Sequence, residues 1–165
     1  MKVYLFGSKD LYVVPDCIRE HIVKIMEQLG GDVEFMVKDG SGIDCGFHEA
    51  LSAIGARKYT KIYTLGSAKN NKYDLDEHTL ELEFDPNVKE VIVKDNGNII
   101  GEQFDVNNIE EAYFQPGFYE IRDRYMAEQC DFAICFTEPD NKAVQREITK
   151  LSVHNKYVYT YKVAV

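Results

Sequence analysis

Two short glycine-containing loops are the stretches of this 165-residue sequence whose residue types and spacing point most directly to chemistry. Each follows an apolar run, and the second, "DGSGID", precedes a run with helical spacing. Glycine lets a backbone approach a bound group closely, and N–H groups at a helix start bind phosphate. A plain turn between a strand and a helix explains the same residues. The residues that we assign to ligand binding are Gly7, Ser8, Lys9, Gly40, Ser41, Gly42 and Asp44.

Asp44 in the second loop has two further interpretations. Its place just before a helical stripe predicts that it caps that helix. It also lies four residues before His48, so the two side chains share one helix face and could form a ligand or acid–base pair. A packed or solvated histidine explains the same spacing without chemistry.

Strand and helix patterns alternate along the chain and place both loops at one edge of a sheet. The runs "KVYLFG", "VEFMV" and "KIYTLG" predict strands, and apolar stripes between them predict two helices. The pattern resumes with a helix over about 116–129, a strand, a helix over about 142–153 and a last strand. This order predicts an α/β fold with a Rossmann-like, doubly wound and mainly parallel sheet. Ligands bind such sheets at the carboxyl ends of the strands, where both loops would lie.

The chain reads as a single domain over residues 1–165, with an elaboration over about 66–112. Within the elaboration, "VKEVIVKDNGNIIGEQF" predicts an inserted β-hairpin that turns near Asn96 and Gly97. The preceding stretch is polar and irregular, apart from a short apolar alternation at its end.

Composition and charge exclude several function classes. A formal net charge of -9 provides no basic surface for a polyanion, so we expect no nucleic-acid partner and no anionic membrane. No apolar run approaches the roughly 20 residues that span a bilayer. The four cysteines form no CxxC pair, which favours a reducing, cytoplasmic setting. We expect neither a metal ion nor a cofactor.

Several segments resemble known families. "GSGIDCGFHEAL" resembles the Ile-Asp-x-x-x-His segment of the DNA-processing protein Smf/DprA, and "EIRDRYMAEQCDFAICF" resembles a segment of the LOG cytokinin-activating phosphoribohydrolases. "KIYTLGSAKNNKYD" and "HNKYVYTYKV" are similar to the small YspA-like branch of the same SLOG superfamily of Rossmann-like nucleotide-binding domains. The resemblance implies a nucleotide-like small ligand and a homodimer paired through helices beside the sheet.

The sequence departs from the LOG pattern at one important loop. LOG enzymes carry Pro-Gly-Gly-x-Gly-Thr-x-x-Glu after the late strand, whereas this chain has "TEPDNKAVQRE". Glu147 alone can be aligned with the motif's carboxylate, with a two-residue shift, and Arg122 matches the arginine of the preceding helix. The resemblance therefore implies catalytic roles for Arg122 and Glu147, with the carboxylate stabilising an oxocarbenium-like sugar. A simple ion pair between neighbouring helices is the alternative.

Three hypotheses about function follow from these residues. The missing glycines favour a nucleotide or nucleotide-derived ligand binding or sensing domain of SLOG type. The retained Arg122 and Glu147 support a LOG-like nucleoside 5′-monophosphate N-glycosidase, a phosphoribohydrolase. The third hypothesis is a non-catalytic interaction module.

Overall fold

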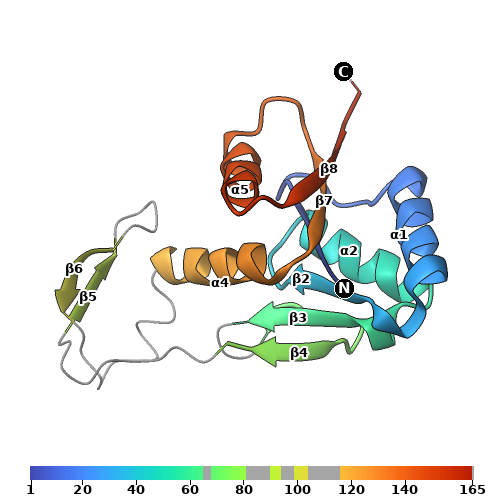
Figure 1. Cartoon of the computed structure of the whole chain (residues 1–165), viewed down its shortest axis with the longest axis horizontal. Helices are drawn as coiled ribbons and strands as arrows, with labels where there is room; N and C mark the ends of the chain where they lie inside the picture. Colours follow the sequence, from blue (N-terminus) through green and yellow to red (C-terminus); the bar gives the residue numbers. More distant parts are fainter. Residues whose placement is uncertain (65–67, 81–89, 94–98, 104–115, 165) are drawn as a thin grey trace.

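The computed structural model of the chain describes residues 1–64, 68–80, 90–93, 99–103 and 116–164 (Figure 1). Six parallel strands form one sheet in the order β4-β3-β2-β1-β7-β8. The strands of this sheet are β1 (Lys2–Gly7), β2 (Glu34–Lys38), β3 (Thr60–Thr64), β4 (Asp76–Thr79), β7 (Phe132–Thr137) and β8 (Tyr157–Lys162). The helices are α1 (Asp16–Leu29), α2 (Ile43–Ala53), α4 (Pro116–Gln129) and α5 (Lys142–Val153), with short 3₁₀ turns at Gly30–Asp32 and Arg57–Tyr59.

The strand order shows where the chain reverses direction across the sheet. Strands are added outward from β1 to β4, and the chain then returns through α4 to β7 and β8 on the other side of β1. Helices cover both faces (Figure 1). The predicted doubly wound α/β fold is thus confirmed, and the reversal between β1 and β7 is the position at which such sheets bind ligands.

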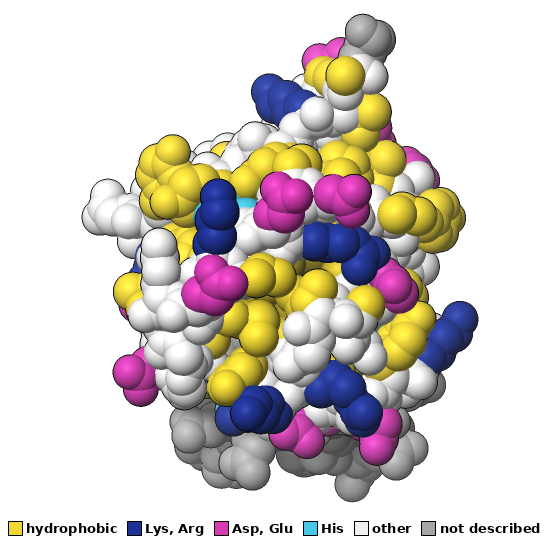
Figure 2. Space-filling view, turned by 90° about the vertical axis from the view of Figure 1, so that its right-hand side faces the viewer, with side chains coloured by type: hydrophobic (Ala, Val, Ile, Leu, Met, Phe, Trp, Pro, Cys, Tyr) yellow, Lys and Arg dark blue, Asp and Glu magenta, His cyan; other side chains and the backbone are white. Residues whose placement is uncertain are grey.

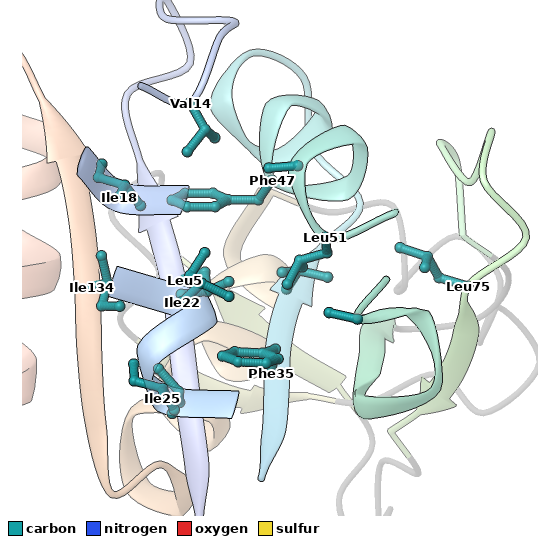
Figure 3. Close-up of a cluster of buried hydrophobic side chains, with 14 of the residues drawn as sticks. Leu5, Val14, Ile18, Ile22, Ile25, Phe35, Phe47, Leu51, Leu75 and Ile134 are labelled. Atoms are coloured by element: carbon teal, nitrogen blue, oxygen red, sulfur yellow. The ribbon is translucent and has the colours of Figure 1, made fainter. Parts of the chain in front are cut away.

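Alternating side chains of the strands divide the core into two layers. On one face, strand residues such as Leu5 and Phe35 pack against Ile22 of α1 and Phe47 of α2 in an apolar core (Figure 3). On the other face, residues such as Phe6, Met36 and Tyr63 pack against α4 and α5. The helix partners on this second face are Met126, Ala127, Cys130, Val144 and Leu151.

Between β3 and α4 the chain forms a further parallel strand and a β-hairpin. Strand β4 was not predicted, because its residues Asp76–Thr79 are polar and largely exposed and show no apolar alternation. It is held by pairing with β3, continued by a hydrogen bond of 2.8 Å from the Leu80 N–H to the Thr64 carbonyl. The predicted hairpin is present as β5 (Glu90–Val93) and β6 (Ile99–Gln103), a separate antiparallel pair. Its predicted turn at 96–97 lies outside the described residues.

Candidate functional site

The two glycine loops meet at the edge where the parallel strands end, here called the carboxyl edge. The Ile43 N–H donates a hydrogen bond of 3.2 Å to the Ser8 carbonyl, which joins the start of α2 to the end of β1. Gly42 has a φ of 73°, and a Cβ at this position would collide with the Lys9 carbonyl. The side chains of Lys9 and Ser41 are exposed at the rim. Close packing between the loops thus accounts for Gly42 without a ligand.

The other glycines of these loops also have packing roles. A Cβ at Gly7 would collide with the carbonyl of Phe136 in the adjacent strand β7. A Cβ at Gly40 would lie 2.5 Å from an Asp44 carboxylate oxygen. These glycines let the strand ends and the buried Asp44 come together, so the spacing of glycines does not by itself identify a phosphate site.

The prediction that Asp44 caps α2 is wrong. The N-cap position is held by Gly42, without a side-chain hydrogen bond, and Asp44 is the second residue of the helix. The helix starts earlier than expected because the Ser8 carbonyl already accepts the Ile43 N–H. Asp44 is instead buried, and burial raises the pKa of its carboxyl group.

His48 packs helix α2 onto strand β2. Its Nε2 donates a hydrogen bond of 2.7 Å to the Lys38 carbonyl, and the ring is buried. Burial lowers the pKa of His48, against the raising effects of this hydrogen bond and of Asp44. Its contacts are those of a packed helix residue.

A group of charged side chains lies beside these loops on the face covered by α4 and α5. We call it the charged cluster, and its members are Lys38, Asp39, Asp44, Arg122, Asp123 and Glu147. Lys38 Nζ lies 3.0 Å from Glu147 Oε1 and 3.9 Å from Asp123 Oδ2. The Tyr4 hydroxyl approaches Glu147 Oε2 at 3.4 Å. Glu147 therefore has partners on both carboxylate oxygens.

Arg122 joins the cluster to the loop after β2. It donates from one terminal nitrogen to Asp39 at 2.7 Å and from Nε to Asp123 at 3.2 Å. The side chains of Arg122 and Asp39 are each only 7% exposed, so this pair is shielded from water. Asp39 also accepts the Lys69 N–H at 2.9 Å. Arg122 thereby positions Asp123 beside Lys38.

The charged cluster contains more carboxyl groups than cations, and this imbalance decides its electrostatics. Its cations are Lys38 and Arg122, and its carboxyl groups are Asp39, Asp44, Asp123 and Glu147. Burial and the neighbouring carboxylate of Asp123 raise the pKa of Glu147 to about 7, although Lys38 opposes the shift. Burial would raise the pKa of Asp123 as well, but Lys38 and Arg122 outweigh it and lower that pKa. Near neutral pH the cluster therefore exchanges a proton at Glu147.

Lys38 remains a full positive charge within this cluster. Burial alone would lower its pKa, but Asp123 and Glu147 outweigh that effect and raise the pKa well above its ordinary value. Its side chain is 9% exposed, and its ammonium lies 5.8 Å from the centroid of the Tyr4 ring. Lys38 is thus held among groups that keep it protonated.

The structure brings together the two residues for which the resemblance implied catalytic roles, but through other partners. Arg122 and Glu147 lie in one cluster, where Arg122 contacts Asp39 and Asp123 while Glu147 contacts Lys38 and Tyr4. Lys38, Asp123 and Tyr4 were missed in the sequence. The signal for Lys38 was present, because strand alternation places it on the same face as the buried Met36.

A second carboxylate, Glu138, lies at the end of β7. Its interaction with the Ser8 side chain lowers the pKa of Glu138. The Ser8 oxygen in turn accepts the Asp10 N–H at 3.0 Å. The ends of β1 and β7, on either side of the reversal, are joined by a backbone hydrogen bond of 3.0 Å from the Ser8 N–H to the Phe136 carbonyl.

The described residues contain no group of three or more histidine, cysteine or acidic side chains arranged to hold a metal ion. Within the same ranges, no helix is both long and apolar enough to cross a membrane. On the side of the molecule that carries α1, basic and acidic side chains are interspersed among apolar ones (Figure 2).

Comparison of the chain with protein-family models, with curated proteins and with solved structures found no match. The SLOG resemblance and the homodimer that it implies therefore stay predictions.

Proposed function

We propose that the protein binds a nucleoside or nucleotide at the carboxyl edge and hydrolyses its N-glycosidic bond, with Glu147 as the catalytic carboxylate. The observation that carries this proposal is Glu147 itself, which has a pKa of about 7 within a cluster that holds more carboxyl groups than cations. Its side chain is 18% exposed. The aligned carboxylate of the LOG segment supports the same residue.

The reaction proposed for this site is a simple hydrolysis. The bond between the sugar C1′ and the base nitrogen breaks, and its electron pair leaves with the base. Water adds its oxygen to C1′, and a proton from that water ends on the base, so the products are the free base and the sugar, which keeps its phosphate when the substrate is a nucleotide. Positive charge develops at C1′ in the transition state, and a nearby carboxylate stabilises that charge.

The neighbours of Glu147 have positioning roles in this scheme. Lys38 and Tyr4 each contact one oxygen of the carboxylate and hold it in a single orientation. Burial and the carboxylate of Asp123, which Arg122 holds in place, keep the pKa of Glu147 high. The unequal charge of the cluster favours a cationic transition state more than a neutral ground state, which is the condition for catalysis.

A base-release assay tests this proposal directly. Wild-type protein at high concentration is incubated with common nucleosides and nucleoside 5′-monophosphates, and free base is measured by chromatography. We expect Glu147→Gln to lower the rate by about 100-fold or more, because Gln keeps the shape and removes the charge. The control is Glu128→Gln on the exposed side of α4, which should leave the rate unchanged. Absence of base release from every substrate, or a fully active Glu147→Gln variant, would contradict the proposal.

Binding without turnover is the second candidate function. It is favoured by the contacts of Glu147, since Lys38 and Tyr4 already occupy both carboxylate oxygens. In that case calorimetry would detect a nucleoside or nucleotide, while the base-release assay would stay at background for wild type and variant alike. The two candidates therefore give different pairs of results.

A further inference from the structure

We infer that the site takes a nucleoside whose sugar carries no phosphate, and that Glu138 selects it by accepting a hydrogen bond from a sugar hydroxyl. This inference rests on the proposed function of the carboxyl edge and names its substrate class. It assigns to Glu138 a role in specificity that is separate from the chemistry at Glu147.

The position of Glu138 places it where the substrate's sugar would lie. It follows directly after β7, and the end of β7 is joined to the end of β1 by the hydrogen bond from the Ser8 N–H to the Phe136 carbonyl. These two strands flank the reversal of the sheet, at which doubly wound folds bind their ligands. Glu147 follows in the next helix, α5, whose first turn begins just beyond this loop.

One oxygen of Glu138 has no partner. Oε1 is shielded from solvent, and no donor reaches it among the residues that the structure describes. A shielded acceptor without a donor is costly, and a ligand hydroxyl would remove that cost. A phosphate dianion has only acceptor oxygens to offer and would be repelled by the carboxylate.

Two groups that could receive a phosphate at this edge, the start of α5 and the cations of the charged cluster, already have protein partners. The first turn of α5 is capped by Asn141, whose side chain accepts the Val144 N–H at 3.1 Å. The cations of the charged cluster, Lys38 and Arg122, are both shielded and bonded to carboxylates. Sugar hydroxyls, which can donate as well as accept, fit this edge better than a dianion does.

Calorimetry and kinetics with matched ligands test this inference. The probes are adenosine, inosine, cytidine and uridine, each compared with its own 5′-monophosphate. We expect the preferred nucleoside to bind at least about 100-fold more tightly than its monophosphate, and kcat/KM to show the same preference. Glu138→Gln should lower the ratio of kcat/KM for the nucleoside to kcat/KM for its monophosphate by about tenfold or more. The main cause should be a higher KM for the nucleoside and a lower KM for the monophosphate.

The matched control is Asp140→Asn, which removes a carboxylate charge from the same loop at an exposed position. It should change the ratio by less than about twofold, which separates a direct contact from a general charge effect. A thermal-unfolding midpoint for each variant checks that the fold is intact, and a merely structural Glu138 would alter stability without altering the ratio.

The outcomes separate this inference from the proposed function. If the protein releases base and prefers the monophosphate, the inference is overturned but N-glycosidic hydrolysis stands. If Lys9→Ala then loses this preference for the monophosphate, the exposed Lys9 is the phosphate contact. Tighter calorimetric binding of the nucleoside without any base release would support the inference and overturn hydrolysis. Failure of every probe to bind at about 1 mM would overturn both.

Discussion

The two faces of the central sheet are built from alternate residues of the same strands, yet they differ in kind. The face under α1 and α2 is filled mainly by apolar side chains (Figure 3). The face under α4 and α5 is apolar around Met36 and Met126 but contains the charged cluster toward the carboxyl edge. Burying charge costs free energy that apolar packing would not, so the second face is where a function other than folding is to be sought.

The apolar face should respond to mutation through stability alone. Phe47 is fully buried between α2 and the sheet. Phe47→Ala should lower the free energy of unfolding by about 4 kcal/mol, because it removes buried surface and leaves a cavity. Urea denaturation measures this change, and calorimetry on the still-folded variant should show unchanged nucleoside affinity. A loss below about 1 kcal/mol would mean that this face is less tightly packed than the structure shows.

The charged face should respond in a pH-dependent way. Lys38→Met removes the cation that contacts Glu147 and Asp123, and we expect a loss of about 3 kcal/mol in the free energy of unfolding. The loss should be larger at about pH 8 than at about pH 5, because protonation of Glu147 relieves the uncompensated charge.

Lys61→Met is the matched control for that experiment. Lys61 pairs with Glu34 at 3.2 Å, but its side chain is 46% exposed. Its replacement should change stability by less than about 1 kcal/mol at either pH. Equal effects of the two lysine variants would remove the distinction between the charged cluster and an ordinary surface pair.

Glu147→Gln should change how stability depends on pH. The pKa of Glu147 is raised from 4.5 to about 7, so its contribution to stability is full below about pH 4.5 and is lost as the pH rises through about 7. The variant does not titrate, so it should gain about 2 kcal/mol relative to wild type between about pH 5 and pH 8. Urea denaturation across this range measures the difference, and parallel curves would show that Glu147 has an ordinary pKa in the fold.

The smallest effect is expected at the start of α5. Asn141→Ala removes the side-chain cap on Val144 and should cost about 1 kcal/mol. Because it frees N–H groups at the helix start, it should also improve binding of a nucleoside monophosphate slightly. Thermal unfolding and calorimetry measure the two effects, and Asp140→Asn, which removes no cap, should show neither.

Much of the architecture was readable from local patterns. The helices at 116–129 and 142–153 have the bounds predicted from the resumed strand–helix alternation, and the parallel sheet follows from the β-α-β order. Strand β4 was not predicted because backbone hydrogen bonds to β3 hold it in place. Such pairing produces no apolar alternation in the sequence of a polar segment. The cap assigned to Asp44 was wrong for a similar reason, since a carbonyl from another loop sets the start of α2.

The sequence by itself determined the layers of this protein, because apolar spacing along a strand or helix is a local property that decides which side is buried. It also predicted that the two glycine loops lie at the carboxyl edge, and a resemblance pointed to Arg122 and Glu147 as candidates. Only the tertiary structure decided that Glu147 meets Lys38, 109 residues earlier in the chain, and that Asp123 lies beside both. A pKa of about 7 at Glu147 results from burial and from neighbouring charges, and neither exists until the sheet and helices have packed together.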